Sequence, residues 1–187
     1  MAVSGVFSAS LRLRVRLSGR GPMIKAAVLT ISDSVCAGKR ADRSGPAVRE
    51  RLEQLGWSVP VVEAIPDEAD EIGTRLALLA DSGQVAAIFT TGGTGVALRD
   101  VTPEATRAVL DREIPGLGEL MRARGREATP LAVLSRALAG TRGRVLIVNL
   151  PGSPKGAVES LDAIVEVVPH VLDLLRGQTE HAAARQE

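Results

Sequence analysis

Unbroken apolar runs alternate with amphipathic segments along most of this sequence. The first run covers residues 26–31 and is rich in β-branched side chains, and similar runs cover residues 57–64 and 85–91. Short continuous runs of this kind are typical of strands that are buried on both faces of a parallel sheet. We therefore expect these three segments to be strands of such a sheet.

Between the runs, apolar residues recur at helical spacing. A helix that begins at Ser44 and ends at Gly56 places its apolar side chains on one face. Three further helices of the same kind are expected at residues 72–79, 103–110 and 117–126.

The second half of the chain is expected to add two strands and a last helix. Residues 131–139 and 144–150 are predicted strands, and a turn at residues 140–143 would allow an antiparallel pair. The last helix carries apolar residues at helical spacing from Leu161 to Leu175, and Pro169 should bend or fray it. Strands that alternate with helices at short spacing indicate a three-layer α/β/α sandwich with a mixed, mostly parallel sheet.

Polar residues follow the predicted parallel strands at their carboxyl ends. Ser32 and Asp33 follow the first strand, Asp67 follows the second, a glycine loop follows the third, and residues 149–155 follow the last. Sheets of this class bind ligands beyond the carboxyl ends of their strands. The order of elements therefore predicts that four loops converge on one pocket.

The loop after residue 91 has the composition of a phosphate-binding turn. The amides of Gly92, Gly93 and Gly95 can approach a ligand closely, and Thr102 and Pro103 then supply an N-cap and a first helical position. The loop matches neither a Walker A motif nor a full dinucleotide fingerprint. A simple tight turn from strand to helix is the alternative, and the charged residues beside the loop favour phosphate binding.

Arg99 and Asp100 lie between these glycines and the next helix. Together with Asp67, Asp100 suits a Mg²⁺-nucleotide, because Mg²⁺ typically takes one or two carboxylates plus phosphate oxygens. The alternatives are that Asp100 only neutralises Arg99 and that Asp67 only caps the next helix. Lys155, at the start of the last helix, either favours an anion there or is simply solvated.

Composition excludes several classes of function. The net charge is +1 and aromatic residues make up 2%, so the chain lacks the basic field and the stacking surfaces of nucleic-acid binders. No segment approaches the length of a membrane span. The single cysteine, Cys36, cannot form an intramolecular disulfide and fits a reducing cytoplasm. Both histidines, His170 and His181, lie late in the chain, so we expect no histidine-based nucleophile at the glycine loop.

The 187 residues suit one domain with short tails. Residues 1–22 are rich in arginine and contain no acidic residue, and we expect a disordered extension or a start assigned upstream of Met23. A transit-like targeting segment is the alternative. Residues 23–178 form the expected single domain, and residues 179–187 a polar tail.

Six short motifs follow one another along the chain. They are Leu-Thr-Ile-Ser-Asp at 29–33, Asp-Arg-Ser-Gly-Pro at 42–46, Ile-Pro-Asp-Glu at 65–68, the glycine loop with Arg-Asp-Val-Thr-Pro-Glu-Ala at 91–105, Leu-Ser-Arg at 134–136 and Asn-Leu-Pro-Gly-Ser-Pro-Lys at 149–155. In this order they resemble the MogA/MoaB family of molybdenum cofactor biosynthesis, over about residues 23–178.

The resemblance implies a molybdopterin-binding α/β/α domain that is usually a homotrimer. In the MogA branch, AMP is transferred from Mg²⁺-ATP to the terminal phosphate of molybdopterin, pyrophosphate leaves, and the product passes to a MoeA-like insertase. The resemblance places the two functional carboxylates at Asp67 and Asp100, which we expect to be catalytic and to hold Mg²⁺. The other residues expected to bind substrates are Thr91, Gly92, Gly93, Thr94, Gly95, Arg99, Ser135, Asn149, Pro151, Gly152, Ser153 and Lys155.

The Asn-Leu-Pro-Gly run favours the adenylylating MogA branch. The alternative is a MoaB-type protein, which resembles this chain equally at the glycine loop and binds molybdopterin without adenylylating it. A third interpretation, nucleotide hydrolysis, requires a water-activating base for which the sequence offers no candidate.

Overall fold

The computed structural model describes residues 23–178, and the N-terminal extension and polar tail expected from the sequence lie outside the described residues. Within residues 23–178, six strands form one sheet in the order β2-β1-β3-β6-β5-β4. The parallel strands are β1 (Lys25–Ile31), β2 (Ser58–Ile65), β3 (Ala87–Thr91) and β6 (Val145–Leu150). At the other edge, β5 (Ala139–Arg142) runs antiparallel to β6 and to the short β4 (Arg112–Glu113). The predicted mixed, mostly parallel sheet is confirmed.

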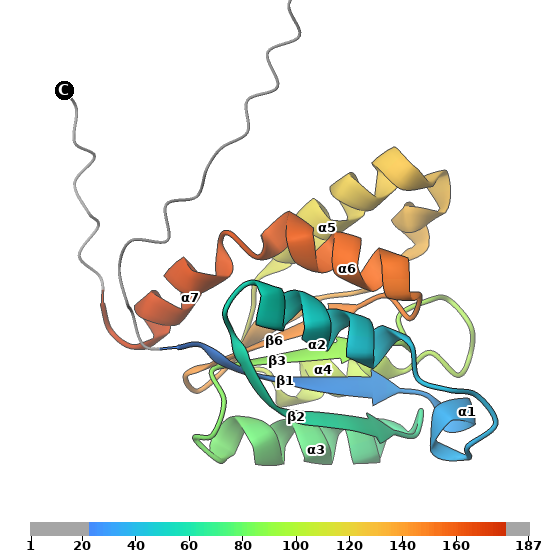
Figure 1. Cartoon of the computed structure of the whole chain (residues 1–187), viewed down its shortest axis with the longest axis horizontal. Helices are drawn as coiled ribbons and strands as arrows, with labels where there is room; N and C mark the ends of the chain where they lie inside the picture. The colour runs from blue at the N-terminus through green and yellow to red at the C-terminus, as the bar shows by residue number, and fades with distance from the viewer. Residues whose placement is uncertain (1–22, 179–187) are drawn as a thin grey trace, which may run out of the picture.

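Helices cover both faces of this sheet and make a three-layer sandwich (Figure 1). Alternate residues of the central strands point to opposite layers, so Phe89 and Val148 pack in one core while Ile88 and Ile147 pack in the other. The first core lies under α2 (Ser44–Gln54), α5 (Pro115–Ala128), α6 (Pro154–Ile164) and α7 (Val168–Leu175), and the second lies under α3 (Ala69–Asp81) and α4 (Thr102–Val109).

The prediction of a strand over residues 131–139 is wrong for most of its length. Residues Pro130–Leu134 form a 3-10 helix, η1, and Thr129 caps it by accepting a hydrogen bond from the Leu131 amide at 3.3 Å. Pro130 in its first turn favours a helical start, and the side chain of Leu131 is exposed rather than buried in a sheet. The predicted turn at 140–143 is also too early, because β5 continues to Arg142 and the chain reverses at Gly143, whose φ is +54°.

Two other helical segments differ from the sequence pattern. Asp33–Cys36 forms one short helical turn, α1, directly after β1, where the sequence pattern predicted no helix. The last helix is divided between Ile164 and Val168, and Pro169 lies in the first turn of α7. The bend predicted at Pro169 is therefore confirmed as a break, because proline is tolerated in a first turn and not in a helix interior.

The four parallel strands all end at one edge of the sheet. In Figure 1 the arrows of β1 and β2 point to the side where α1 and the loop after β3 lie. The predicted site residues follow these strand ends, so the fold brings their four loops to one edge. No helix within the described part of the chain is long and apolar enough to cross a membrane.

Candidate functional site

The glycine loop leaves β3 and packs tightly against the ends of β1 and β2. Gly92 and Gly93 have φ values of +108° and +62°, which side chains rarely adopt. A Cβ on Gly92 would clash with the Ile31 carbonyl oxygen, and one on Gly93 would clash with Thr102 Oγ1 and lie 2.9 Å from Asp67 Oδ1. Glycine is therefore required here by both backbone conformation and space.

Thr102 ties this loop to α4 in a way that the sequence did not predict. It is the first helical residue instead of the N-cap, which is Val101 and makes no side-chain capping bond. Thr102 Oγ1 donates to the Gly92 carbonyl at 3.0 Å, and its amide donates to the Gly93 carbonyl at 3.2 Å. Both hydrogen bonds hold carbonyl groups of the glycine loop in place, and they therefore help to fix the path of its backbone.

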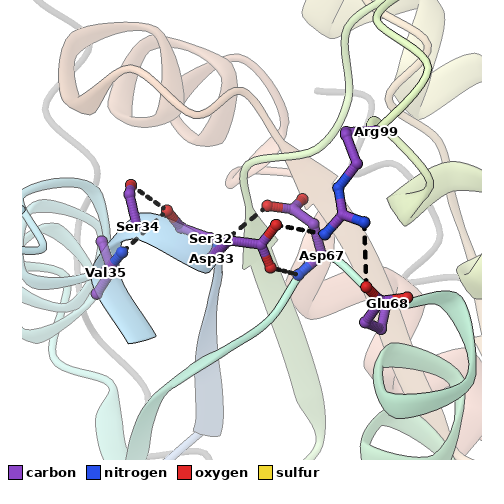
Figure 2. Close-up of polar contacts among 7 residues, drawn as sticks. All are labelled: Ser32, Asp33, Ser34, Val35, Asp67, Glu68 and Arg99. Atoms are coloured by element: carbon purple, nitrogen blue, oxygen red, sulfur yellow. Dashed lines mark hydrogen bonds and ion pairs between the residues drawn. The ribbon is translucent and has the colours of Figure 1, made fainter. Parts of the chain in front are cut away.

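A cluster of carboxylates and one arginine joins the ends of β1 and β2 to the far side of the glycine loop (Figure 2). The Asp67 amide donates to Asp33 Oδ1 at 3.0 Å, and the Asp33 amide donates to Asp67 Oδ2 at 3.3 Å. Arg99 forms ion pairs with Asp33 and, at 3.1 Å, with Glu68. The alternative in which Asp100 neutralises Arg99 is thus not what the fold adopts.

The pKa values of the two aspartates in the cluster, Asp33 and Asp67, are shifted in opposite directions. The hydrogen bond from Arg99 is the main reason that the pKa of Asp33 is lowered. Burial is the main reason that the pKa of Asp67 is raised, and the negative charges of Asp33 and Asp100 add to that rise. A cation bound beside Asp67 would relieve this unfavourable environment.

The carboxylates at the loop fit a metal that arrives with a phosphate-bearing ligand. Among residues 23–178, no group of three His, Cys, Asp or Glu side chains could hold a metal ion alone. Mg²⁺ needs only one or two carboxylates when phosphate oxygens and water complete its shell. A Cβ atom added to Gly93 would lie 2.9 Å from Asp67 Oδ1, and one added to Gly95 would lie 2.8 Å from Asp100 Oδ2. Both carboxylates therefore adjoin the glycine loop.

Asp100 also stabilises the loop internally. Its Oδ2 accepts a hydrogen bond from the Ala97 amide at 2.8 Å, and its own amide donates to the Ala97 carbonyl at 2.9 Å. One carboxylate oxygen is therefore committed to the loop, which leaves the other oxygen as the candidate ligand for a cation.

A cleft of about 410 Å³ opens beside the glycine loop, between α5, η1 and the start of α6. Met121, Ala132 and Leu134 contribute apolar walls, and Ser135 contributes a hydroxyl. The sequence had placed Ser135 in a strand, but in the structure it directly follows η1. The predicted site residues that line this cleft are Thr94, Gly95, Ser135, Pro151, Gly152 and Ser153. Apolar walls with a few polar groups suit a small organic ligand that carries polar groups.

The loop after β6 forms the other rim of the cleft. Thr91 Oγ1 donates to the Pro151 carbonyl at 2.7 Å, and the Cβ position of Gly152 lies 3.3 Å from Gly92 Cα. Ser153 caps α6 by accepting from the Gly156 amide at 3.1 Å. The last loop and the glycine loop are thus packed directly against each other.

The side chains of three predicted site residues, Thr91, Asn149 and Lys155, do not line this cleft. Thr91 is buried, and so is Asn149, whose Nδ2 donates to Thr90 Oγ1 at 3.0 Å and to Thr106 Oγ1 at 2.9 Å. These side chains support β3, β6 and α4 from inside. Lys155 is 82% exposed and lies 3.8 Å from Glu159, as expected for a solvated lysine.

Sequence reasoning missed two charged residues of the site. Glu68 is one of the two partners of Arg99, and Arg136 donates to main-chain oxygens of the glycine loop. Both residues stand in the short motifs at 65–68 and 134–136, which are the signal that could have identified them. The partners of Arg136 lie more than 30 residues away, so the sequence could not name them.

Comparison with known proteins shows how far the similarity extends. A family model described as a probable molybdopterin binding domain matches residues 27–170. The molybdopterin adenylyltransferase of Helicobacter pylori J99 is 43% identical over 157 residues, which cover 82% of this chain and 89% of that protein. The molybdopterin adenylyltransferase of Escherichia coli K12 is 38% identical over 168 residues, covering 82% and 86%. The crystal structure of the molybdopterin biosynthesis enzyme MoaB from Thermus thermophilus is 52% identical with a TM-score of 0.78, covering 83% of this chain and 98% of that one.

Proposed function

Because this chain belongs to the family of probable molybdopterin binding domains, we propose that it transfers AMP from ATP to the terminal phosphate of molybdopterin and releases pyrophosphate. The main observation behind the proposal is that an apolar cleft and a glycine loop with two carboxylates adjoin each other. An apolar cleft of about 410 Å³ shares Gly95 with a glycine loop that is flanked by Asp67 and Asp100. The cleft suits a pterin ring and the loop suits phosphates. The identity to proteins named molybdopterin adenylyltransferases supports the same reaction.

The reaction requires the protein mainly to align the two substrates and to stabilise negative charge. The attacking group is a phosphate anion, so no base has to deprotonate it, and catalysis consists of positioning the two substrates and stabilising charge on the transferred phosphoryl group. This fits a loop region whose ion pairs are formed by carboxylates and arginines. The amides of residues 92–95 would bind phosphate oxygens, and Ser135 would hold the pterin.

Asp67 and Asp100 would hold Mg²⁺, which supplies positive charge at the phosphate oxygens when it is bound with ATP. The raised pKa of Asp67 supports this role, because a carboxylate in an unfavourable environment gains from a cation. Arg99 would then remain the partner of Asp33 and Glu68 or turn to a phosphate.

The test is to incubate the protein with molybdopterin, Mg²⁺ and ATP and to follow adenylyl-molybdopterin and pyrophosphate. We expect both products, and we expect EDTA to abolish them. Asp100→Asn should lower turnover by about 100-fold or more, the scale of one lost electrostatic contact to a transition state. Its amide oxygen can still accept from the Ala97 amide, so the loop should keep its shape and pterin binding should survive. Unchanged turnover of this variant would contradict the role given to Asp100.

A MoaB-type protein that binds molybdopterin without adenylylating it is the second candidate. The 52% identity to the Thermus thermophilus protein named MoaB favours it. Tight pterin binding without adenylyl-molybdopterin, under conditions in which a relative such as the Escherichia coli enzyme makes product, would select this candidate.

We also propose a cytoplasmic homotrimer that passes its product to a MoeA-like insertase. Exposed apolar side chains outside the cleft, among them Val133 of η1 and Leu120 of α5, would be covered in such an assembly. Light scattering should then give three times the chain mass of 19.6 kDa. A monomer at micromolar concentration would contradict the trimer while leaving the reaction untouched.

A further inference from the structure

Arg136 reaches across the glycine loop and binds it at both ends. Its Nε donates to the Gly95 carbonyl at 2.6 Å, its Nη2 donates to the Asp100 carbonyl, and its Nη1 pairs with Glu104 in the first turn of α4. The Arg136 amide adds a fourth contact by donating to the Thr94 carbonyl at 2.9 Å. One residue thus holds the start of the loop, its end and the helix that follows.

The loop between these contacts has little else to hold it. Val96 and Leu98 at its tip are exposed, and Leu98 is fully exposed, so no apolar side chain there anchors the loop to a core. The other anchors near Asp100 are its own bonds to Ala97, the contacts of Arg99 with Asp33 and Glu68, and the side chain of Val101, which packs against the second core at the end of the loop. Arg99 makes ion pairs on an exposed surface, which stabilise little. The charge-assisted bonds from a guanidinium to two carbonyls are stronger than neutral ones.

Arg136 also connects this loop to the wall of the cleft. It directly follows Ser135, which lines the cleft at the end of η1. The segment that carries Ser135 is therefore tied to the backbone from which the Asp100 carboxylate branches. A planar guanidinium can hold two carbonyls in a fixed relation, whereas a lysine ammonium cannot match that geometry.

We propose that Arg136 is a positioning residue, which holds the Gly95–Asp100 loop so that the carboxylate of Asp100 stays aligned with a pterin bound against Ser135. This inference rests on the proposed adenylyl transfer. Arg136 itself touches no reacting atom in this assignment. Its loss should therefore weaken alignment in the transition state more than binding of molybdopterin.

The experiment compares Arg136→Gln and Arg136→Lys with Arg142→Gln. Arg142 is the matched control, because it also joins a carboxylate, Asp81, to a main-chain oxygen, that of Val109, but lies in β5 away from the cleft. The readouts are kcat, the Kd for molybdopterin, the melting temperature and hydrogen exchange of the amides of residues 94–101. The full chain is used throughout.

For Arg136→Gln we expect kcat to fall by about 100-fold, the usual effect of a displacement near 1 Å at a reacting site. The Kd for molybdopterin should change by less than about threefold, since the cleft walls remain. Exchange in residues 94–101 should accelerate, and Arg136→Lys should restore part of kcat. Arg142→Gln should lower the melting temperature to a similar extent and leave kcat and loop exchange unchanged.

Two results separate this inference from the proposed function. If the wild-type chain makes no adenylyl-molybdopterin, the proposed function fails, and loop exchange alone decides whether Arg136 positions the loop. If Arg136→Gln loses stability like Arg142→Gln but keeps its kcat and its loop protection, Arg136 is only structural and the inference is overturned.

Discussion

At the scale of single residues, Asp33 and Asp67 show how two adjacent strand ends create opposite electrostatic environments. Asp33 gains a hydrogen bond from Arg99, which lowers its pKa, whereas burial and the charges of Asp33 and Asp100 raise the pKa of Asp67. A raised carboxyl pKa means that the folded state binds a proton more tightly than the unfolded state. The ionised Asp67 therefore opposes folding at neutral pH, a typical feature of groups kept for function.

This environment predicts that Asp67→Asn stabilises the fold while it abolishes adenylyl transfer. At pH 7 the melting temperature should rise by about 1–3 °C, the shift that corresponds to less than one kcal/mol in a domain of this size. An asparagine oxygen can still accept from the Asp33 amide. The gain should shrink as the pH falls through the folded-state pKa of Asp67, because the wild-type carboxyl then becomes neutral too.

Differential scanning calorimetry between pH 4 and pH 8 measures this effect. Asp70→Asn is the matched control, because Asp70 is exposed in the first turn of α3, where its charge favours the helix. It should lower the melting temperature slightly or leave it unchanged. An Asp67→Asn protein that melts below the wild type at pH 7 would refute the electrostatic account.

At the scale of elements, the glycine loop depends on close backbone contact as much as on flexibility. Gly38 and Gly93 have nearly equal φ values, +67° and +62°. A Cβ on Gly38 would meet nothing within 4 Å, whereas one on Gly93 would meet Thr102 and Asp67. The pair therefore separates the cost of a left-handed backbone from the cost of a collision.

Gly38→Ala should cost about 1 kcal/mol of unfolding free energy, the typical strain of a side chain at positive φ. Gly93→Ala should cost about 3 kcal/mol or more, because the loop must move away from Thr102 and Asp67 in addition. Urea unfolding measures both values. Equal costs would mean that the loop yields easily and does not need glycine for space.

The segment of residues 130–138 shows where reasoning from an apolar pattern fails. Its leucines and valine read as a strand, but Pro130 and the Thr129 cap start a 3-10 helix, and Leu131 stays exposed. A short apolar run cannot by itself distinguish a strand from a short helical segment. By contrast, the break at Pro169 could be predicted, because the effect of proline on a helix is local.

At the scale of the whole molecule, the order of strands and helices was enough to predict the sandwich and the edge where the loops meet. The ends of β1, β2, β3 and β6 converge because parallel strands share a direction, which alternating apolar runs already imply. Sequence could not predict that Arg99 pairs with Asp33 and Glu68, nor that Asn149 points inward to Thr106. Those partners are set by side-chain directions in the folded chain.

From the same packing we predict that residues 23–178 form the smallest stable unit. Both cores are closed by side chains between β1 and α7, and Val168 and Leu172 of α7 are almost fully buried in the first core. A chain shortened to residues 23–178 should therefore melt within about 1 °C of the full chain, because contacts in both cores are kept. Its kcat should match as well, since every residue assigned to the site is retained.

A chain that ends at Ile164 is the matched comparison. It loses Val168 and Leu172, and each large buried side chain removed from a core costs about 2–5 kcal/mol, so most or all of the stability should be lost. Circular dichroism during heating distinguishes the two chains. If the chain of residues 23–178 melted well below the full chain, the domain would extend beyond these residues, and the assignment of a single unit closed by α7 would be wrong.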